Sequence, residues 1–155
     1  MKVEYGTLQD IESWMQLVQR VRWNFPGLET AAALDDHRKT VLRFMSENRA
    51  LCVKDAEKVV GVLLLSKKHN MICCLAVAPE YRRNGIASAL LEKALAELDS
   101  SRDITVTTFR ENDEKGIAPR ALYIPNKIYQ VLDRFEKGKY PYLFYIYASS
   151  KFPTY

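Results

Sequence analysis

The chain has 155 residues, which is enough for one sizeable hydrophobic core but too few for two ordinary enzyme domains. Apolar residues make up 48% and charged residues 27%, a balance that excludes disordered and fibrous proteins. The formal charge of +4 favours an anionic partner, but the charges are interleaved along the chain. Nucleic acid is therefore not indicated, and a phosphorylated small molecule fits the same charge. We predict one domain over residues 1–155.

The sequence shows no pattern of export or membrane insertion. Residues 1–6 lack the apolar segment that follows a basic start in a secretory leader. No run of about 18 apolar residues occurs, so we expect no transmembrane helix. We predict a cytoplasmic protein without a membrane partner.

Three cysteines, Cys52, Cys73 and Cys74, lie in apolar surroundings. Their number is odd and none forms a CxxC pair, and only His37 and His69 accompany them. We therefore expect buried thiols, with neither a disulfide framework nor a metal site.

The N-terminal part predicts a short strand followed by two helices. After a strand over residues 2–5, Thr7 and Asp10 have the spacing of a capping box. The apolar face of the next helix comprises Ile11, Trp14, Met15, Val18 and Val21. Beyond a turn at Pro26 we expect a second helix with Asp35 as its cap. It would dock through Val41, Leu42 and Met45.

The middle of the chain predicts strands around one clear helix. Residues 50–54, 58–66 and 71–77 are rich in Val, Leu and Ile, and short charged turns between them favour antiparallel pairing. Over residues 85–98 the apolar positions recur at helical spacing. Residues 104–109 alternate as a strand, which completes a right-handed βαβ unit.

Beyond residue 109 the pattern weakens. Residues 110–115 form a charged loop, a short helix is expected around residues 118–123, and the aromatic stretch 140–147 predicts a final strand. The coarse fold class is α/β with a mixed sheet.

The segment from Leu75 to Ala87 joins a predicted strand to the clearest helix. A helix N-terminus has N–H groups without partners and a partial positive charge, so it can hold phosphate oxygens. Gly85 lets the backbone approach a ligand, and Arg82 and Arg83 add cationic donors. The arrangement suits a pyrophosphate, but spacing alone leaves open a plain turn with two solvated arginines.

Motifs of other enzyme classes do not occur in the sequence. There is no GxxxxGK[ST], and residues 83–87 lack the paired early glycines of a dinucleotide fingerprint. There is no GxSxG elbow, and the two histidines lie in unrelated settings. A hydrolase is therefore not supported.

With this segment the chain resembles the GNAT acetyltransferase superfamily, whose signature reads Gln or Arg, any two residues, Gly, any residue, then Gly or Ala. Arg82, Gly85 and Ala87 occupy the defined positions. Residues 75–79, residues 90–91 and the order of elements also resemble the family, so the resemblance covers nearly the whole chain. It implies a GNAT-like α/β (α+β) fold with a central mixed, mostly antiparallel sheet flanked by helices.

The resemblance implies acetyl-CoA as the cosubstrate and no metal. In such enzymes the strand before the signature offers backbone groups to the pantetheine arm, here those of Leu75 and Val77, and the N–H of Val77 would meet the thioester oxygen during catalysis. Arg82 and the backbone N–H groups after it would hold the pyrophosphate. These N–H groups belong to Arg83, Asn84, Gly85, Ile86 and Ala87.

A second resemblance lies at Leu122-Tyr123, which matches the pair that opens the last helix of the family. The tyrosine there sits near the sulfur of coenzyme A, so Tyr123 is the implied general acid, with a packed aromatic as the alternative. The chain departs from the family just afterwards, because Lys127-Ile128 replaces Gly-Phe and Pro125 should shorten or shift the helix.

The general base has no obvious position. Many relatives use a glutamate on the strand before the signature, but residues 71–77 contain no carboxylate. Glu111, Asp113 and His69 are the candidates, of which we select Glu111, and a water chain is the alternative.

We therefore predict an enzyme, an acetyl-CoA-dependent N-acetyltransferase in which a primary amine attacks the thioester directly. The acceptor would be a small molecule or a peptide, with no nucleic acid partner and with a homodimer left open. A coenzyme-A-binding regulatory domain without turnover is the first alternative, and a nucleic-acid-binding module is the second.

Overall fold

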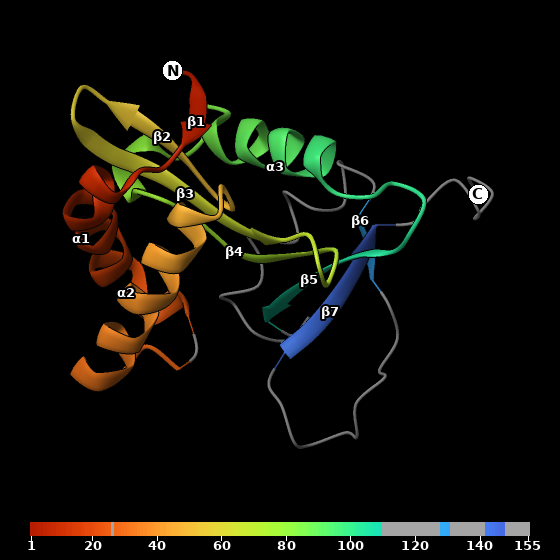
Figure 1. Ribbon diagram of the computed structural model, residues 1–155, viewed down its shortest axis with the longest axis horizontal. Coiled ribbons are helices and arrows are strands. Elements are labelled where there is room, and N and C mark those ends of the chain that lie inside the picture. Colours follow the sequence, from red (N-terminus) through yellow and green to blue (C-terminus); the bar gives the residue numbers. More distant parts are fainter. Residues whose placement is uncertain (26, 110–127, 131–141, 148–155) are drawn as a thin grey trace. The chain divides into compact units, whose positions relative to one another are not determined.

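The computed structural model in Figure 1 describes residues 1–25, 27–109, 128–130 and 142–147. The chain forms two compact units: Met1–Leu65 with Cys74–Ala94, and Ser66–Cys73 with Leu95–Tyr155. Strand β4 (Met71–Val77) and helix α3 (Ile86–Glu97) have residues in both units. No helix in the described part of the chain is long and apolar enough to cross a membrane.

The capping box predicted before helix α1 (Ile11–Val21) forms on a 3-10 turn, Leu8–Asp10, which leads directly into the helix. The backbone N–H and the hydroxyl of Thr7 donate to one carboxylate oxygen of Asp10, at 2.8 and 2.9 Å. The buried face of the helix comprises Ile11, Trp14, Leu17, Val18 and Val21. Leu17 thus belongs to this face, whereas Met15 is only half-buried.

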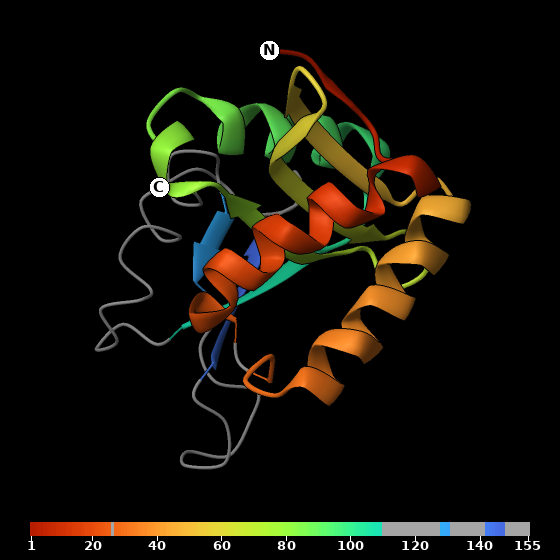
Figure 2. The same cartoon turned by 90° about the vertical axis from the view of Figure 1, so that its left-hand side faces the viewer.

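Helix α2 (Ala31–Ser46) begins earlier than the sequence pattern predicts. The hydroxyl of Thr30 accepts the N–H of Ala33 at 3.0 Å, so Thr30 is the cap and the assignment of Asp35 was wrong. Alanines at residues 31–33 are strong helix formers, which extends the helix back to Thr30. Helix α2 packs against α1, as Figure 2 shows.

Strands β1 (Val3–Tyr5), β2 (Ala50–Asp55) and β3 (Lys58–Ser66) pair antiparallel in that order. A tight turn joins β2 to β3, and its Ala56 has a φ of 50°. Every residue from Val59 to Leu65 is buried, so both faces of β3 are covered.

Helix α3 packs on β3 at Gly61. A Cβ atom at Gly61 would lie 2.6 Å from Cγ2 of Ile86 and 3.2 Å from Cδ1 of Leu90, so the glycine allows a close approach of helix and strand. In the first unit α3 lies over one face of β2 and β3, while α1 and α2 lie over the other (Figures 1 and 2). This double cover explains the burial of β3.

In the second unit β4 pairs parallel with β5 (Ile104–Phe109), with Met71 opposite Thr105. Strand β5 pairs antiparallel with β7 (Tyr142–Tyr147), and β7 pairs antiparallel with β6 (Ile128–Gln130). The predicted order of strand, helix and strand in the βαβ unit is confirmed by β4, α3 and β5. Strand β6 was not predicted. The predicted fold class, an α/β fold with a mixed, mostly antiparallel sheet flanked by helices, is confirmed.

The turn before β4 is held by Asn70, which is 2% exposed and has a φ of 49°. Its Nδ2 donates to the carbonyl oxygens of Asp99 and Asp103 at 2.9 and 3.0 Å, and its Oδ1 accepts the N–H of Asp99 at 2.9 Å. Its backbone carbonyl accepts the N–H of Thr105 at 3.2 Å. One side chain therefore ties this turn to the connection between α3 and β5.

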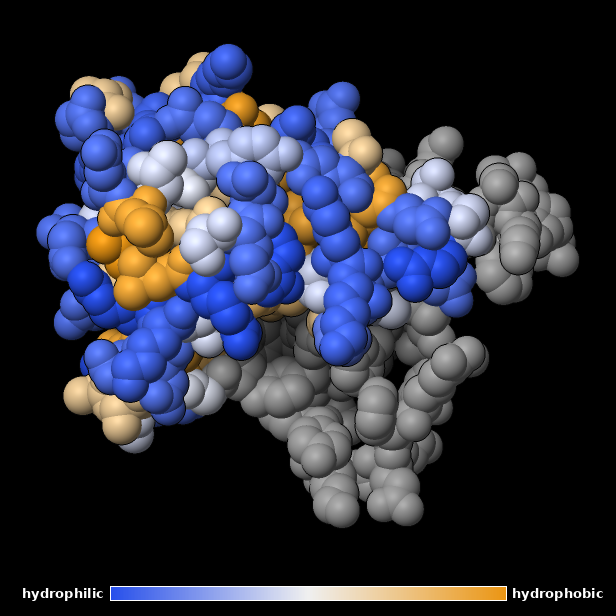
Figure 3. Space-filling view, viewed as in Figure 1, coloured by the Kyte–Doolittle hydropathy of each residue, from blue (hydrophilic) through white to orange (hydrophobic). Residues whose placement is uncertain are grey.

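The three cysteines differ in burial. Cys52 is buried, and burial raises the pKa of its thiol to about 12. Cys73 is exposed, so the prediction of a buried thiol was wrong there, because apolar neighbours in sequence do not ensure that a strand face is covered. Figure 3 shows mostly polar residues on the described surface in that view, with smaller apolar patches between them.

Candidate functional site

The connection between β4 and α3 carries the signature residues. Strand β4 ends at Val77, Ala78 donates its N–H to the carbonyl of Val60 at 2.8 Å, and a 3-10 turn spans Pro79–Tyr81. We call residues 82–87 the signature loop. Its exposed residues are Arg82, Arg83, Asn84 and Gly85, and its last two, Ile86 and Ala87, begin α3.

Two residues of the signature loop have a left-handed backbone. The φ angle is 64° at Arg83 and 77° at Gly85. This conformation costs about 1–2 kcal/mol for a residue with a Cβ atom, whereas glycine adopts it readily. A Cβ atom at Gly85 would meet no heavy atom within 4 Å, so the described residues leave open space there. Gly85 is therefore required by the backbone conformation, and a ligand can approach the backbone at this point.

Helix α3 begins directly after Gly85. The N–H of Ala89 donates to the carbonyl of Gly85 at 3.0 Å, which opens the helical ladder. N–H groups before that bond have no intrahelical partner, and the positive end of the helix dipole lies among them. Ile86, the first residue of α3, is only 5% exposed, whereas Gly85 directly before it is exposed. The buried Ile86 therefore fixes the position of the exposed Gly85. This end of α3 can hold phosphate oxygens.

The side chain of Arg82 folds back on the end of β4. Its Nε donates to the carbonyl of Val77 at 3.2 Å. Within the loop, Nδ2 of Asn84 donates to the carbonyl of Tyr81 at 3.3 Å. Because Arg82 and Arg83 are both exposed, their positive charges lie at the solvent surface of the loop. Arg82 therefore ties the signature loop to the end of β4 and also adds positive charge to the loop.

The two residues before the signature loop are bonded to distant parts of the chain. Glu80 accepts both terminal guanidinium nitrogens of Arg20 at 3.0 and 2.8 Å, and Nζ of Lys58 at 3.2 Å. These bonds, that from Arg20 above all, lower the pKa of Glu80 to about 2. The hydroxyl of Tyr81 donates to the carboxylate of Asp55 at 2.5 Å, and this bond raises the pKa of Tyr81.

Leu75 and Val77, the residues predicted to meet the pantetheine arm, lie in the second part of β4. Val77 is 8% exposed and Leu75 is half-buried. The parallel register of β4 with β5 covers Met71 and Ile72, so Leu75 and Val77 lie beyond that ladder. Both residues belong to the same compact unit as the signature loop.

Of the residues considered for acid or base catalysis, the structure describes His69 alone. Tyr123, Glu111 and Asp113 are outside the described residues, so their roles stay predictions. His69 is described; it is exposed, and its backbone N–H donates to Oγ of Ser66 at 3.2 Å. Among the described residues no group of three or more His, Cys, Asp or Glu could hold a metal ion.

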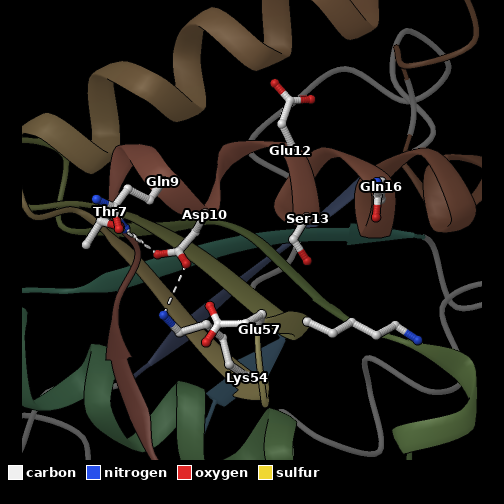
Figure 4. Close-up of a pocket in the computed structure, with 9 residues that line it drawn as sticks. Thr7, Gln9, Asp10, Glu12, Ser13, Gln16, Lys54 and Glu57 are labelled. Carbon is white, nitrogen blue, oxygen red and sulfur yellow. Dashed lines mark hydrogen bonds and ion pairs between the residues drawn. The ribbon is translucent and has the colours of Figure 1, made fainter.

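A separate pocket of about 620 Å³ lies beside α1 (Figure 4). It is lined by Thr7, Gln9, Asp10, Glu12, Ser13, Gln16, Lys54, Glu57 and Lys58. Asp10 and Lys54 point toward each other and pair at 3.1 Å, and Glu12 points away from them. Burial opposes the charge of Asp10, but hydrogen bonds from Thr7 and Lys54 outweigh it and lower its pKa. No signature-loop residue lines this pocket.

The family comparison agrees with this geometry. The model of the Acetyltransferase (GNAT) family matches residues 9–118, which include β4, the signature loop and α3. Because the match spans well over half of the chain, the protein belongs to the GNAT acetyltransferase family, and the resemblance seen in the sequence is confirmed. No curated protein matches the chain.

Solved acetyltransferase structures share the fold. A GNAT-family acetyltransferase from Bacillus cereus has a TM-score of 0.70 and 19% identity over 94% of each chain. A ribosomal-protein-alanine N-acetyltransferase from Brucella melitensis has a TM-score of 0.70 and 15% identity over 94% of this chain and 98% of its own. The PaiA N-acetyltransferase from Thermoplasma acidophilum, solved with coenzyme A, has a TM-score of 0.65 and 13% identity over 94% of this chain and 96% of its own. At these identities the likeness shows the fold alone.

Proposed function

We propose that the protein transfers the acetyl group of acetyl-CoA to a primary amine on a small molecule or peptide. The observation that carries this proposal is the signature loop, an exposed connection with a left-handed Gly85 in a chain of the GNAT family. Helix N-termini and guanidinium groups both favour phosphate oxygens, and Arg82 and Arg83 lie within the four residues before the start of α3. Such a loop suits the pyrophosphate of coenzyme A.

The remaining cosubstrate contacts follow from the position of β4. Its backbone groups at Leu75 and Val77 would bond to the pantetheine arm, which brings the thioester to the end of the strand. Arg82 already bonds to the carbonyl of Val77, so the phosphate and thioester ends of the site are linked through one side chain. The backbone N–H groups of residues 83–87 would receive the pyrophosphate.

The proposed reaction is direct acetyl transfer. An uncharged amine attacks the thioester carbonyl, a C–N bond forms, and the oxyanion accepts a hydrogen bond from the N–H of Val77. The C–S bond then breaks, and Tyr123 gives its proton to the departing thiolate. Glu111 is our candidate for the base that takes the proton from the nitrogen. Binding both reactants together supplies much of the rate through proximity.

Turnover with a panel of amines tests this function. We expect thiol release from acetyl-CoA to depend on the amine, and mass spectrometry should find one acetyl group on the acceptor. A protein that binds acetyl-CoA but releases no thiol with any small amine or peptide N-terminus would contradict the proposal and support a regulatory domain.

The Tyr123→Phe variant tests the proposed general acid. It keeps the ring and removes only the proton donor, so we expect turnover to fall by roughly 10²-fold. The dissociation constant of acetyl-CoA should stay nearly constant, because the interaction matters mainly in the transition state. Full turnover in this variant would exclude Tyr123 as the acid, and a large loss of thermal stability would make it structural.

A further inference from the structure

Three elements of the first unit fix the residues that precede the signature loop. Glu80 is bonded to Arg20 of α1 and to Lys58 of β3, and Tyr81 is bonded to Asp55 of β2. Lys58 also lies 5.7 Å from the centre of the Tyr81 ring. We call these five residues the Glu80–Tyr81 clamp.

The exposure of the clamp argues against a mainly structural role. The side chains of Arg20 and Glu80 are 46% and 42% exposed. Exposed ion pairs contribute little to folding, because water and salt screen them and two long side chains lose freedom. What distinguishes this pair is its place in the chain, directly before Arg82 and the left-handed Arg83.

The signature loop should bind a ligand more tightly if it is ordered before the ligand arrives. Arg83 keeps an unfavourable backbone conformation at the surface, and such residues persist only where their surroundings enforce them. A loop that must be ordered when its ligand arrives loses affinity through that ordering. Contacts that fix Glu80 and Tyr81 before binding reduce this cost.

Charge gives the clamp a second effect. The carboxylate of Glu80 would repel an anion bound at the loop, but Arg20 and Lys58 compensate its charge. Loss of Arg20 leaves the negative charge of Glu80 less compensated, whereas loss of the Glu80 charge frees the cations of Arg20 and Lys58. The two substitutions should therefore weaken phosphate binding by different amounts.

We propose that the Glu80–Tyr81 clamp positions the signature loop for phosphate binding, with Arg20, Glu80 and Tyr81 as positioning residues that act through the loop. This inference rests on the proposed function, because it requires coenzyme A at the loop. It adds residues from α1, β2 and β3 to a site otherwise formed by β4 and α3.

Calorimetric titration of clamp variants with coenzyme A and with pantetheine, which lacks the phosphates, tests this proposal. We expect Arg20→Gln to raise the dissociation constant of coenzyme A by about fivefold and Glu80→Gln by about twofold. The double variant should resemble Glu80→Gln, because the uncompensated carboxylate is then gone. Tyr81→Phe should raise the dissociation constant of coenzyme A by about threefold. Pantetheine should bind to all variants with the same affinity.

The matched control is Arg38→Gln. Arg38 of α2 donates to the carboxylate of Glu12 through both terminal nitrogens. The substitution therefore removes an Arg–Glu pair of the same kind away from the signature loop. We expect no change in coenzyme A affinity, and thermal unfolding should show that every variant is folded.

Several results would overturn the inference. Unchanged coenzyme A affinity in Arg20→Gln, equal weakening of coenzyme A and pantetheine, or a double variant as weak as Arg20→Gln would each contradict it while leaving the proposed function intact. A wild-type protein that does not bind coenzyme A would contradict the proposed function itself and the inference with it.

Discussion

Arg83 in the signature loop and Asn70 in the turn before β4 both have a left-handed backbone, yet their surroundings differ. Asn70 is 2% exposed, and its side-chain amide bonds to backbone groups of Asp99 and Asp103. Arg83 is exposed and lies just before the start of α3. The first N–H groups of that helix have no hydrogen-bond partner within the helix. The left-handed backbone at Asn70 serves the architecture, whereas at Arg83 it would serve the proposed phosphate site.

The largest effect should come from Gly85→Glu, which we expect to abolish coenzyme A binding in calorimetry. The new side chain brings bulk and negative charge to the point where phosphates approach. A positive φ makes this substitution strained, at about 1–2 kcal/mol, but no described atom is close enough to clash.

Gly27→Glu is the matched control for this experiment. Gly27 also has a positive φ, 87°, and a Cβ atom there would meet nothing within 4 Å. It should show the same backbone cost and an unchanged affinity for coenzyme A. Equal affinity in a folded Gly85→Glu protein would refute the pyrophosphate assignment.

At the other turn, Asn70→Ala should lower the free energy of unfolding by about 3 kcal/mol. The substitution removes the hydrogen bonds between the buried Asn70 side chain and backbone groups of Asp99 and Asp103, at about 1 kcal/mol each. Denaturant unfolding measures the loss, and Asn84→Ala is the exposed comparison, expected to cost less than about 0.5 kcal/mol. Similar values for both variants would erase the distinction between the two turns.

Arg82→Ala should weaken coenzyme A binding by about 1–3 kcal/mol, the range for a hydrogen bond to a charged group. The variant also loses the bond from Nε to the carbonyl of Val77, so the loop becomes less constrained. Titration at two salt concentrations checks the electrostatic share, since salt should weaken the wild-type complex more than the variant. A salt response that is identical in both proteins would count against the charge of Arg82.

The smallest effect is expected from Arg83→Gly. It relieves the left-handed strain at Arg83, so stability should rise by up to about 1 kcal/mol, offset in part by the greater freedom of glycine in the unfolded chain. Asn70→Gly makes the same backbone change and should instead be destabilising, because Asn70 also loses its buried hydrogen bonds. Thermal unfolding of both proteins decides whether they differ in sign.

Elements with strong local signals could be predicted from the sequence. The bounds of β3, β4 and β5 agree with the expected strands, and α3 lies within residues 85–98, because apolar composition and spacing are local properties. The signature loop could be located for the same reason. The cap of α2 was missed because Thr30 precedes a run of alanines and Asp35 stood closer to the apolar positions.

The Glu80–Tyr81 clamp illustrates what local patterns do not reveal. Arg20 and Lys58 lie far from Glu80 in the chain, and one exposed ion pair leaves no periodic trace in a sequence. Only the fold of α1 and β3 brings these charges to the same carboxylate. The hint that existed was the position of Glu80 and Tyr81 directly before the signature.

Amide hydrogen exchange with and without coenzyme A tests the central claim most directly, because it reports on both turns in one experiment. Our account predicts that the ligand protects the amides of residues 83–87 and leaves those of residues 67–70 unchanged. Binding that protects other segments while residues 83–87 exchange as before would contradict the assignment of the signature loop as the phosphate site.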